Sequence, residues 1–154
     1  WAYGVSDDGN TIVGRSGSVN GDRAVRWGSG TGMLDLGVLA GDSESFAYAV
    51  TAGGSAVVGQ SGNADIGRAF VWTETLGMVS LQTILDQRGI SYTGWSTLTI
   101  ASDISSDGRF ICGHGIFNGS RQAFVVDLGS PIPAPGTLAS AACARLLVAR
   151  RRRS

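Results

Sequence analysis

The stretch Val5–Gly14, "VSDDGNTIVG", decides the fold because the chain contains three versions of it. It returns as "VTAGGSAVVG" at Val50–Gly59 and as "ISSDGRFICG" at Ile104–Gly113. In each version a turn containing glycine separates two segments rich in β-branched residues. Asp-Gly and Gly-Gly pairs supply the positive φ that a tight hairpin turn needs. Each version therefore predicts two antiparallel strands joined by a short turn.

The three versions belong to a longer repeat. Between the first and second copies every equivalent residue is 45 positions apart, so that Trp27 corresponds to Trp72 and Met33 to Met78. The third copy follows the second at an offset of 54, after a nine-residue insertion. The blocks of the first copy that recur are 2–5, 12–14, 24–27 and 32–36. A constant period of this size is typical of repeat architectures.

Each unit contains four strand-like segments, which in the first copy are "WAYGVS", "TIVGRSG", "RAVRWG" and "GMLDLGVL". Four strands in about 45 residues is the size of a β-propeller blade. We therefore predict an all-β domain over residues 1–129, with repeated four-stranded antiparallel units at about 1–45, 46–80 and 98–129. This would be a β-propeller-like partial array of about three blades, with an open β-solenoid and a two-layer sandwich as alternatives. Because propellers need at least four blades to close, and Trp1 aligns with strand residue Phe46, we expect the C-terminal part of a longer array.

Residues 80–97 form a helical insertion between the second and third units. Ser80 is suited to cap the start of a short amphipathic helix and Gly89 to end it. We expect this helix to cover the sheets as a lid or terminal cap. Its apolar face would consist of Leu81, Ile84 and Leu85.

Several aromatic residues recur with the repeat, including the pairs Trp27 and Trp72, and Tyr3 and Tyr48. Aromatic residues that follow the fold period are expected in the core between blades. The alternative is a ring of aromatic side chains that lines a groove for polysaccharide. Trp95 lies in the non-repeating insertion and is the better candidate for a ligand contact.

The C-terminal segment has a different composition. We assign 130–137 as a Pro-rich linker and 138–154 as a membrane or sorting tail that contains a C-terminal hydrophobic helix. The apolar stretch is shorter than the roughly 20 residues that span a bilayer, and arginines after it indicate a cytoplasmic end. A basic amphipathic helix at a membrane surface and a disordered end are the alternatives.

Charge is divided unevenly along the chain. All twelve acidic residues lie at or before Asp127, whereas five of the twelve arginines lie in the last ten positions. The rest of the chain has a net charge of about −5, and clustered cations are needed to bind phosphate backbones. We therefore expect no nucleic-acid partner.

We expect no catalytic, metal-binding or cofactor-binding residues and no cofactor. His114 is the single histidine, and Cys112 on the same strand face would give only two ligands of a metal site. A propeller glycosidase would need two inward-facing carboxylates. The candidate residues for these carboxylates are Asp35, Asp103 and Asp107.

The blocks "GVSDDGNTIVG", "AVRW" and "GMLDLG" resemble the bacterial extracellular HAF-repeat family over Trp1 to about Gly129. The tail resembles a PEP-CTERM sorting signal, with Pro133, Ala134 and Pro135 at the motif and Arg150, Arg151, Arg152 and Arg153 as the basic end. Ala134 stands where the family motif has glutamate. The resemblance implies a chain that is exported, held transiently in the inner membrane, and cut near the prolines by a membrane-bound sorting enzyme.

These observations favour a non-enzymatic scaffold or binding module at the bacterial cell surface or in the extracellular matrix. A carbohydrate-binding propeller that contacts extracellular polysaccharide is the alternative, and a propeller glycosidase is a further one.

Overall fold

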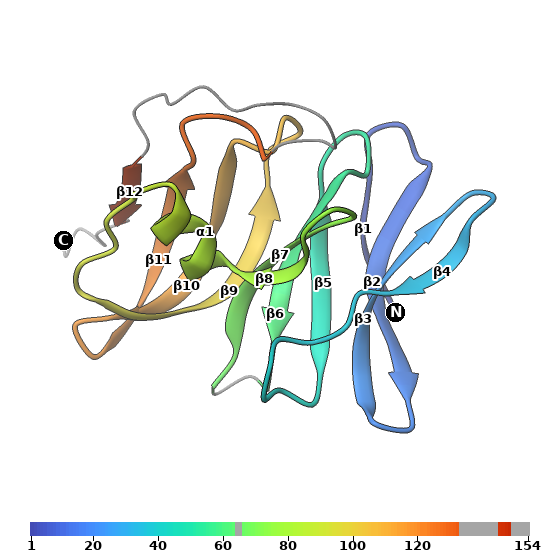
Figure 1. Ribbon diagram of the computed structural model, residues 1–154, viewed down its shortest axis with the longest axis horizontal. Helices are drawn as coiled ribbons and strands as arrows, with labels where there is room; N and C mark the ends of the chain where they lie inside the picture. Colours follow the sequence, from blue (N-terminus) through green and yellow to red (C-terminus); the bar gives the residue numbers. More distant parts are fainter. Residues whose placement is uncertain (64–65, 133–144, 149–154) are drawn as a thin grey trace, which may run out of the picture.

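The computed structural model describes residues 1–63, 66–132 and 145–148, which form three four-stranded antiparallel sheets and one short helix (Figure 1). Sheet 1 consists of β1 (Ala2–Val5), β2 (Thr11–Ser18), β3 (Gly21–Gly28) and β4 (Gly32–Asp35). Sheet 2 consists of β5 (Ser45–Val50), β6 (Ala56–Ser61), β7 (Arg68–Thr73) and β8 (Gly77–Ser80). Sheet 3 consists of β9 (Trp95–Ile104), β10 (Phe110–Phe117), β11 (Ser120–Asp127) and β12 (Arg145–Val148). The prediction of four-stranded antiparallel sheets is confirmed, but the predicted third unit, 98–129, contributes only three of the four strands of sheet 3.

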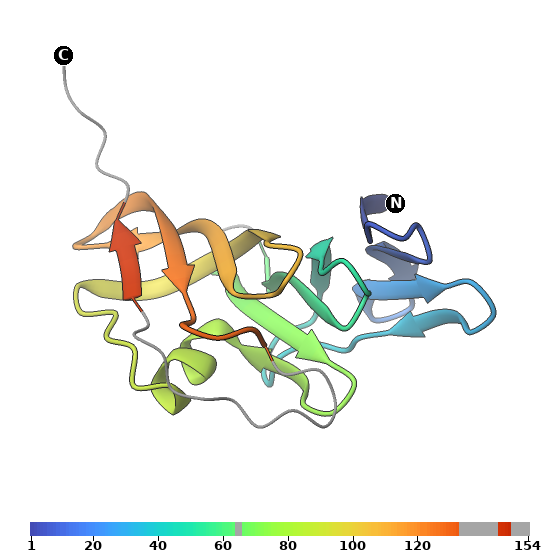
Figure 2. The ribbon, with the colours of Figure 1, turned by 90° about the horizontal axis from the view of Figure 1, so that it is seen from above.

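The sheets follow one another through space in chain order, with sheet 2 between sheets 1 and 3 (Figures 1 and 2). A hydrophobic core lies on each side of sheet 2, because alternate residues of its strands face opposite neighbours. The core shared with sheet 1 includes Val57, Phe70 and Trp72. The core shared with sheet 3 includes Val58 and Val71. This arrangement is β-propeller-like, and the described residues form no closed ring.

One row of apolar side chains crosses each sheet at the same register, and we call it the apolar row. Paired residues of antiparallel strands point to the same face, so each row presents four side chains together. The row of sheet 1 is Val5, Ile12, Trp27 and Met33. The row of sheet 2 is Val50, Val57, Trp72 and Met78. The row of sheet 3 is Ile104, Ile111, Val126 and Leu146.

The recurring stretch builds the turn between the first two strands of every sheet. In sheet 1, Gly9 has a φ of 70° and its amide donates to the Ser6 carbonyl at 2.8 Å. The Ser6 hydroxyl donates to Asp8 Oδ1 at 2.5 Å and accepts from the Thr11 amide at 3.0 Å. In sheet 3 the Ser105 hydroxyl makes the equivalent bonds: it donates to Asp107 Oδ1 at 2.6 Å and accepts from the Phe110 amide at 2.9 Å. The repeated acids of this stretch are therefore parts of a hairpin turn.

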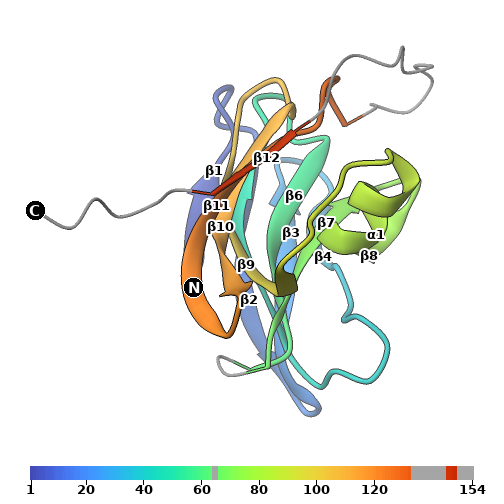
Figure 3. The ribbon, with the colours of Figure 1, turned by 90° about the vertical axis from the view of Figure 1, so that its left-hand side faces the viewer.

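The helical insertion forms as its sequence predicts. Helix α1 (Leu81–Gln87) begins after Ser80, whose hydroxyl accepts from the Thr83 amide at 3.0 Å. Gly89 follows the helix with a φ of 64°. The apolar face packs into the core between sheets 2 and 3, so α1 covers one side of that interface (Figure 3). The buried residues of this face are Leu81, Ile84 and Leu85.

The fourth strand of sheet 3 does not come from the repeat. The segment Arg145–Val148, which lies in the predicted C-terminal hydrophobic helix, is strand β12 and pairs with β11. The helix prediction is therefore wrong for these four residues. Their side chains alternate as in a strand, since Leu146 and Val148 pack against the core while Leu147 faces outward. The rest of the predicted tail lies outside the described residues. No helix among the described residues is both long and apolar enough to cross a membrane.

Candidate functional site

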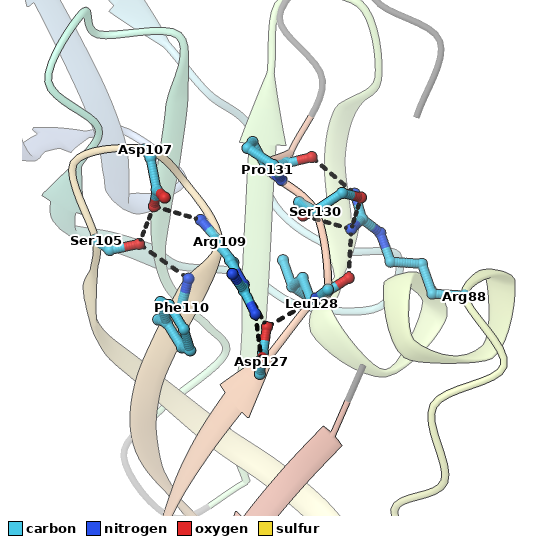
Figure 4. A network of polar contacts seen from close by, with 10 residues as sticks. Arg88, Ser105, Asp107, Arg109, Phe110, Asp127, Leu128, Ser130 and Pro131 are labelled. Atoms are coloured by element: carbon cyan, nitrogen blue, oxygen red, sulfur yellow. Dashed lines mark hydrogen bonds and ion pairs between the residues drawn. The ribbon is translucent and has the colours of Figure 1, made fainter. Parts of the chain in front are cut away.

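The segment that leads out of sheet 3 is held by Arg88, which follows helix α1 (Figure 4). Its guanidinium donates to the carbonyls of Leu128 at 2.9 Å, Ser130 at 2.8 Å and Pro131 at 3.2 Å, and also to the Ser130 hydroxyl. Partial burial lowers the pKa of Arg88 from its usual value. The guanidinium group of arginine carries several N–H donors in one plane, so it can bind several carbonyls of a bent backbone segment at once. We call Leu128–Ile132, held in this way, the C-terminal junction.

A second set of contacts fixes the start and the end of the junction, and Figure 4 shows the pair of Arg109 and Asp127 at its start. Arg109 donates to both carboxylate oxygens of Asp127, at 2.8 and 3.0 Å, and this bidentate pair lowers the pKa of Asp127. Asp127 also accepts from the Gly129 amide at 2.8 Å. At the other end the Ile132 amide donates to the Gly108 carbonyl at 3.2 Å, and the Ile132 side chain is buried. The backbone is therefore fixed against sheet 3 as far as Ile132.

The predicted sorting residues Pro133, Ala134, Pro135 and Arg150–Arg153 lie outside the described residues. The structure therefore shows the part of the chain that leads into the predicted motif. Sequence reasoning missed the role of Arg88, since a single arginine after a helix gives no sign of the carbonyls that it will meet.

Trp95, the predicted ligand contact, lies in the core with 6% of its surface exposed. Its ring lies 5.3 Å from that of Phe117 and 5.8 Å from that of Phe124, measured between centroids. A buried ring offers no open face on which a sugar could stack. β9 begins at Trp95 and directs the side chain between sheets 2 and 3, and a ligand contact by Trp95 stays a prediction.

A cleft of about 460 Å³ nevertheless opens beside Trp95, along the loop between α1 and β9. Residues with polar side chains there include Asp86, Ser91, Tyr92 and Thr93. Interaction with the Asp86 carboxylate is the main reason that the pKa of Tyr92 is raised. A carboxylate and several hydroxyls near aromatic rings can orient a small polar ligand.

The recurring aromatic residues do not share one environment. Trp72 is 8% exposed and lies in the core between sheets 1 and 2, as predicted, whereas Trp27 is 45% exposed. Tyr3 and Tyr48 approach across the boundary of these sheets, with ring centroids 5.6 Å apart. The core prediction is therefore confirmed for Trp72 and wrong for Trp27.

His114 and Cys112 lie on the face of sheet 3 that points away from sheet 2. Partial burial lowers the pKa of His114 and raises that of Cys112. In the described part of the chain, no three His, Cys, Asp or Glu residues are grouped so that they could hold a metal ion.

The three acids considered for glycoside hydrolysis each accept a backbone hydrogen bond. Asp35 accepts from the Gly37 amide at 2.8 Å, and Asp103 from the Ile104 amide at 2.8 Å. Asp107 belongs to the hairpin turn of sheet 3 and accepts from the Arg109 amide at 3.0 Å. Asp35 lies in sheet 1, whereas the other two lie in sheet 3.

Comparisons with known proteins bear on the fold. No protein-family model matches the chain, and neither does any curated protein sequence. Among solved structures, the chain is similar to the crystal structure of TolB from Acinetobacter baumannii, with a TM-score of 0.56 and 19% sequence identity. The similarity covers 84% of this chain and 30% of that chain, so the chain spans about a third of the TolB structure. The likeness supports a β-propeller-like arrangement of the three sheets.

Proposed function

We propose that this chain is part of an exported bacterial protein of the cell surface or extracellular matrix, and that it acts without catalysis as a β-propeller-like scaffold or binding module. The observation that carries the proposal is the repetition of one apolar row in three successive sheets. In repeat proteins, apolar faces that recur in this way are buried when neighbouring units stack on one another. The likeness to TolB supports the same kind of fold.

The placement of the acidic residues supports a structural role. Asp127 pairs with Arg109, Asp42 with Arg68, and the acids at the hairpin turns accept bonds from the turns themselves. A glycosidase needs two carboxylates that face one substrate. Here the acids stabilise separate sheets and turns, which favours the scaffold.

We further propose that the tail directs sorting, through a cut near Pro133–Pro135 by a membrane-bound enzyme. The C-terminal junction supports this proposal because Arg88 holds the chain up to Pro131 and Ile132 is buried. A cut after that point would leave these contacts in place. Insertion of the tail into a membrane would require β12 to leave sheet 3, since Leu146 and Val148 pack against the core.

The test is production of the chain behind a secretion signal in a bacterium that has a PEP-CTERM sorting enzyme, and in a matched strain that lacks it. Intact mass should show loss of the segment containing Arg150–Arg153 only in the first strain. A variant with Pro133 and Pro135 changed to alanine should retain this segment and stay with the inner membrane. Retention of the four arginines by mature protein in both strains would overturn the sorting proposal.

The cleft beside Trp95 favours carbohydrate binding as a second candidate function. A site for a polar ligand such as a sugar combines polar groups with apolar surface, and Asp86 and Tyr92 supply a carboxylate, a hydroxyl and an aromatic ring at this cleft. On a glycan array, Tyr92→Ala and Asp86→Asn should abolish binding, whereas Tyr3→Ala, at an exposed ring on sheet 1, should not. Equal binding by all three variants would exclude the cleft.

A further inference from the structure

Sheet 3 obtains its fourth strand in a different way from sheets 1 and 2. In sheet 1 the chain turns from β3 directly into β4 through residues 29–31, and in sheet 2 it turns from β7 into β8 through residues 74–76. In sheet 3 the chain leaves β11 after Asp127 and comes back as β12 only at Arg145. The position beside β11 is therefore filled by a segment that does not follow β11 through a hairpin turn.

The last residue of the third strand differs between sheets 2 and 3. Thr73 and Asp127 are equivalent at the offset of 54 and end β7 and β11. The Thr73 hydroxyl accepts from the Leu76 amide at 3.2 Å within the turn into β8. The Asp127 carboxylate instead accepts from the Gly129 amide at 2.8 Å and from Arg109, and the C-terminal junction follows (Figure 4). These bonds lead the chain away from the edge of β11, so the edge is left for a strand from elsewhere.

Strand β12 shows which kind of strand this edge accepts. Its Leu146 and Val148 pack against the core between sheets 2 and 3, whereas Leu147 points outward. Their partners on β11, Val126 and Phe124, are buried. The edge therefore accepts an extended strand, antiparallel to β11, with apolar side chains at alternate positions.

Charge adds a second requirement. Arg145 at the start of β12 is the register partner of Asp127. The chain outside its last ten residues has a net charge of about −5. Opposite charges across an interface steer a partner and fix its register, so a basic residue at this end of the incoming strand suits the edge.

We propose that the edge of β11 is an acceptor site for an extended strand of another polypeptide, and that removal of β12 opens it. The removal is the sorting cut near Pro133–Pro135 proposed above, so this inference rests on that function. Without β12 the backbone groups on the outer side of β11 lose their partners, and the core surface under Leu146 and Val148 is uncovered. Unpaired strand edges pair readily with another chain, and addition of a strand to such an edge is a general mode of peptide recognition.

The chemistry of the edge defines the partner strand. It carries a basic residue opposite Asp127 and apolar residues opposite Val126 and Phe124, while the residue opposite Val125 faces outward and is free to vary. As long as β12 is attached it occupies the same place, so the uncut chain does not bind the partner. The sorting cut then both releases the protein and makes it competent to bind.

The experiment uses the full chain with a recognition sequence for a site-specific protease in place of residues 136–139, so that the folded protein can be cut there and dialysed. The probe is a fluorescent synthetic peptide of residues 144–150, "ARLLVAR". In the control peptide, Leu146 and Val148 are both changed to glutamate. Fluorescence anisotropy measures binding to the cut and the uncut protein, and circular dichroism checks that both are folded.

We expect the probe to bind the cut chain at least about tenfold more tightly than the uncut chain, because a tethered strand competes at an effective concentration on the order of millimolar. The control peptide should bind neither. A second variant, the uncut chain with Leu146→Glu and Val148→Glu, should also bind the probe, since the two charges drive β12 out of its place. Leu147→Glu is the matched control and should behave as the unaltered chain, because Leu147 is 57% exposed.

Equal binding of the probe to cut and uncut chains, equal binding of the two peptides, or no binding to the cut chain at about 1 mM, where affinities are very weak, would overturn the proposal. A doubled mass of the cut chain in sedimentation without peptide would also overturn it, because the edge would then belong to a second copy. No sorting enzyme takes part in this experiment, so such results leave the sorting proposal standing. Retention of Arg150–Arg153 in the two-strain test overturns the sorting cut instead, even where the probe binds.

Discussion

Trp27 and Trp72 occupy the same position in consecutive sheets, but Trp27 is 45% exposed and Trp72 only 8%. Each is paired with a methionine on the next strand, Met33 and Met78. The difference arises because sheet 1 covers Trp72, whereas no described residue covers the ring of Trp27 to the same extent. Burial in this molecule is therefore decided by the position of a sheet in the stack as well as by the residue.

The first prediction compares these two tryptophans. Trp72→Ala should lower the free energy of unfolding by about 3–5 kcal/mol, as expected for a large side chain removed from a core. Trp27→Ala should lower it by about 1 kcal/mol. Urea denaturation at low protein concentration, where single chains predominate, measures both. Equal losses would show that the two sheets have the same surroundings.

The second prediction concerns the hairpin turn of sheet 2. Gly54 has a φ of 73°, and an added Cβ would lie 2.2 Å from the Thr11 hydroxyl oxygen. Gly54→Ala should therefore cost at least about 1–2 kcal/mol of stability, from the left-handed backbone alone. Its neighbour Gly53 is the control, because it lacks a positive φ and has open space around it. Gly53→Ala should be neutral or slightly stabilising. The same loss at both positions would contradict the turn geometry.

The third prediction concerns pH. Hydrogen bonds from Ser6 and Ser105 are the main reason that the pKa values of Asp8 and Asp107 are lowered in the folded chain. The unfolded chain therefore binds these protons first as pH falls, since its Asp pKa is about 4. The stabilisation is present above that value and is lost as pH falls through the folded pKa values. Urea midpoints between about pH 7 and pH 2.5 should decrease on the acid side, and less so in the Asp8→Asn, Asp107→Asn variant. An identical acid response in both proteins would count against this assignment.

The fourth prediction tests strand β12. Leu146 occupies the place in sheet 3 that Met78 has in sheet 2 and packs against the core, whereas Leu147 points outward. Leu146→Ala should destabilise the chain by about 2 kcal/mol, at the low end for a buried leucine because its burial is partial. Leu147→Ala should have little effect in the single chain. Thermal unfolding distinguishes the two, and the reverse order would contradict the pairing of β12 with β11.

The fifth prediction concerns Arg88. Arg88→Ala removes the donor that reaches three carbonyls of the C-terminal junction. Amides of Gly129 and Ile132 should then exchange with deuterium faster, while those of β6 should be unaffected. Arg121→Ala, at the exposed start of β11, provides the control. Unchanged exchange at the junction would show that Arg88 does not hold it.

The repeat predicted most of the fold, because its period and its turn residues determine where strands begin and end without any contribution from neighbouring sheets. Asp-Gly and Gly-Gly pairs fix where each sheet reverses, and the cap at Ser80 fixes where α1 begins. The environment of Trp27 could not be predicted in this way, since it depends on which sheet lies beside it. Nor could β12: residues 145–148 form a strand by pairing with the free edge of β11, which overrides the composition of the tail. Arg88 and the cleft depend on loop geometry, for which the sequence has no periodic signal.

The three sheets share one register: residues at equivalent positions of the repeat pair with equivalent partners on the neighbouring strand. Nuclear Overhauser effects measured on the full chain test it most directly. Contacts between Ile12 and Trp27 should be matched by contacts between Val57 and Trp72, and between Ile111 and Val126. A different partner for any one of these residues, or helical contacts in its segment, would contradict the account.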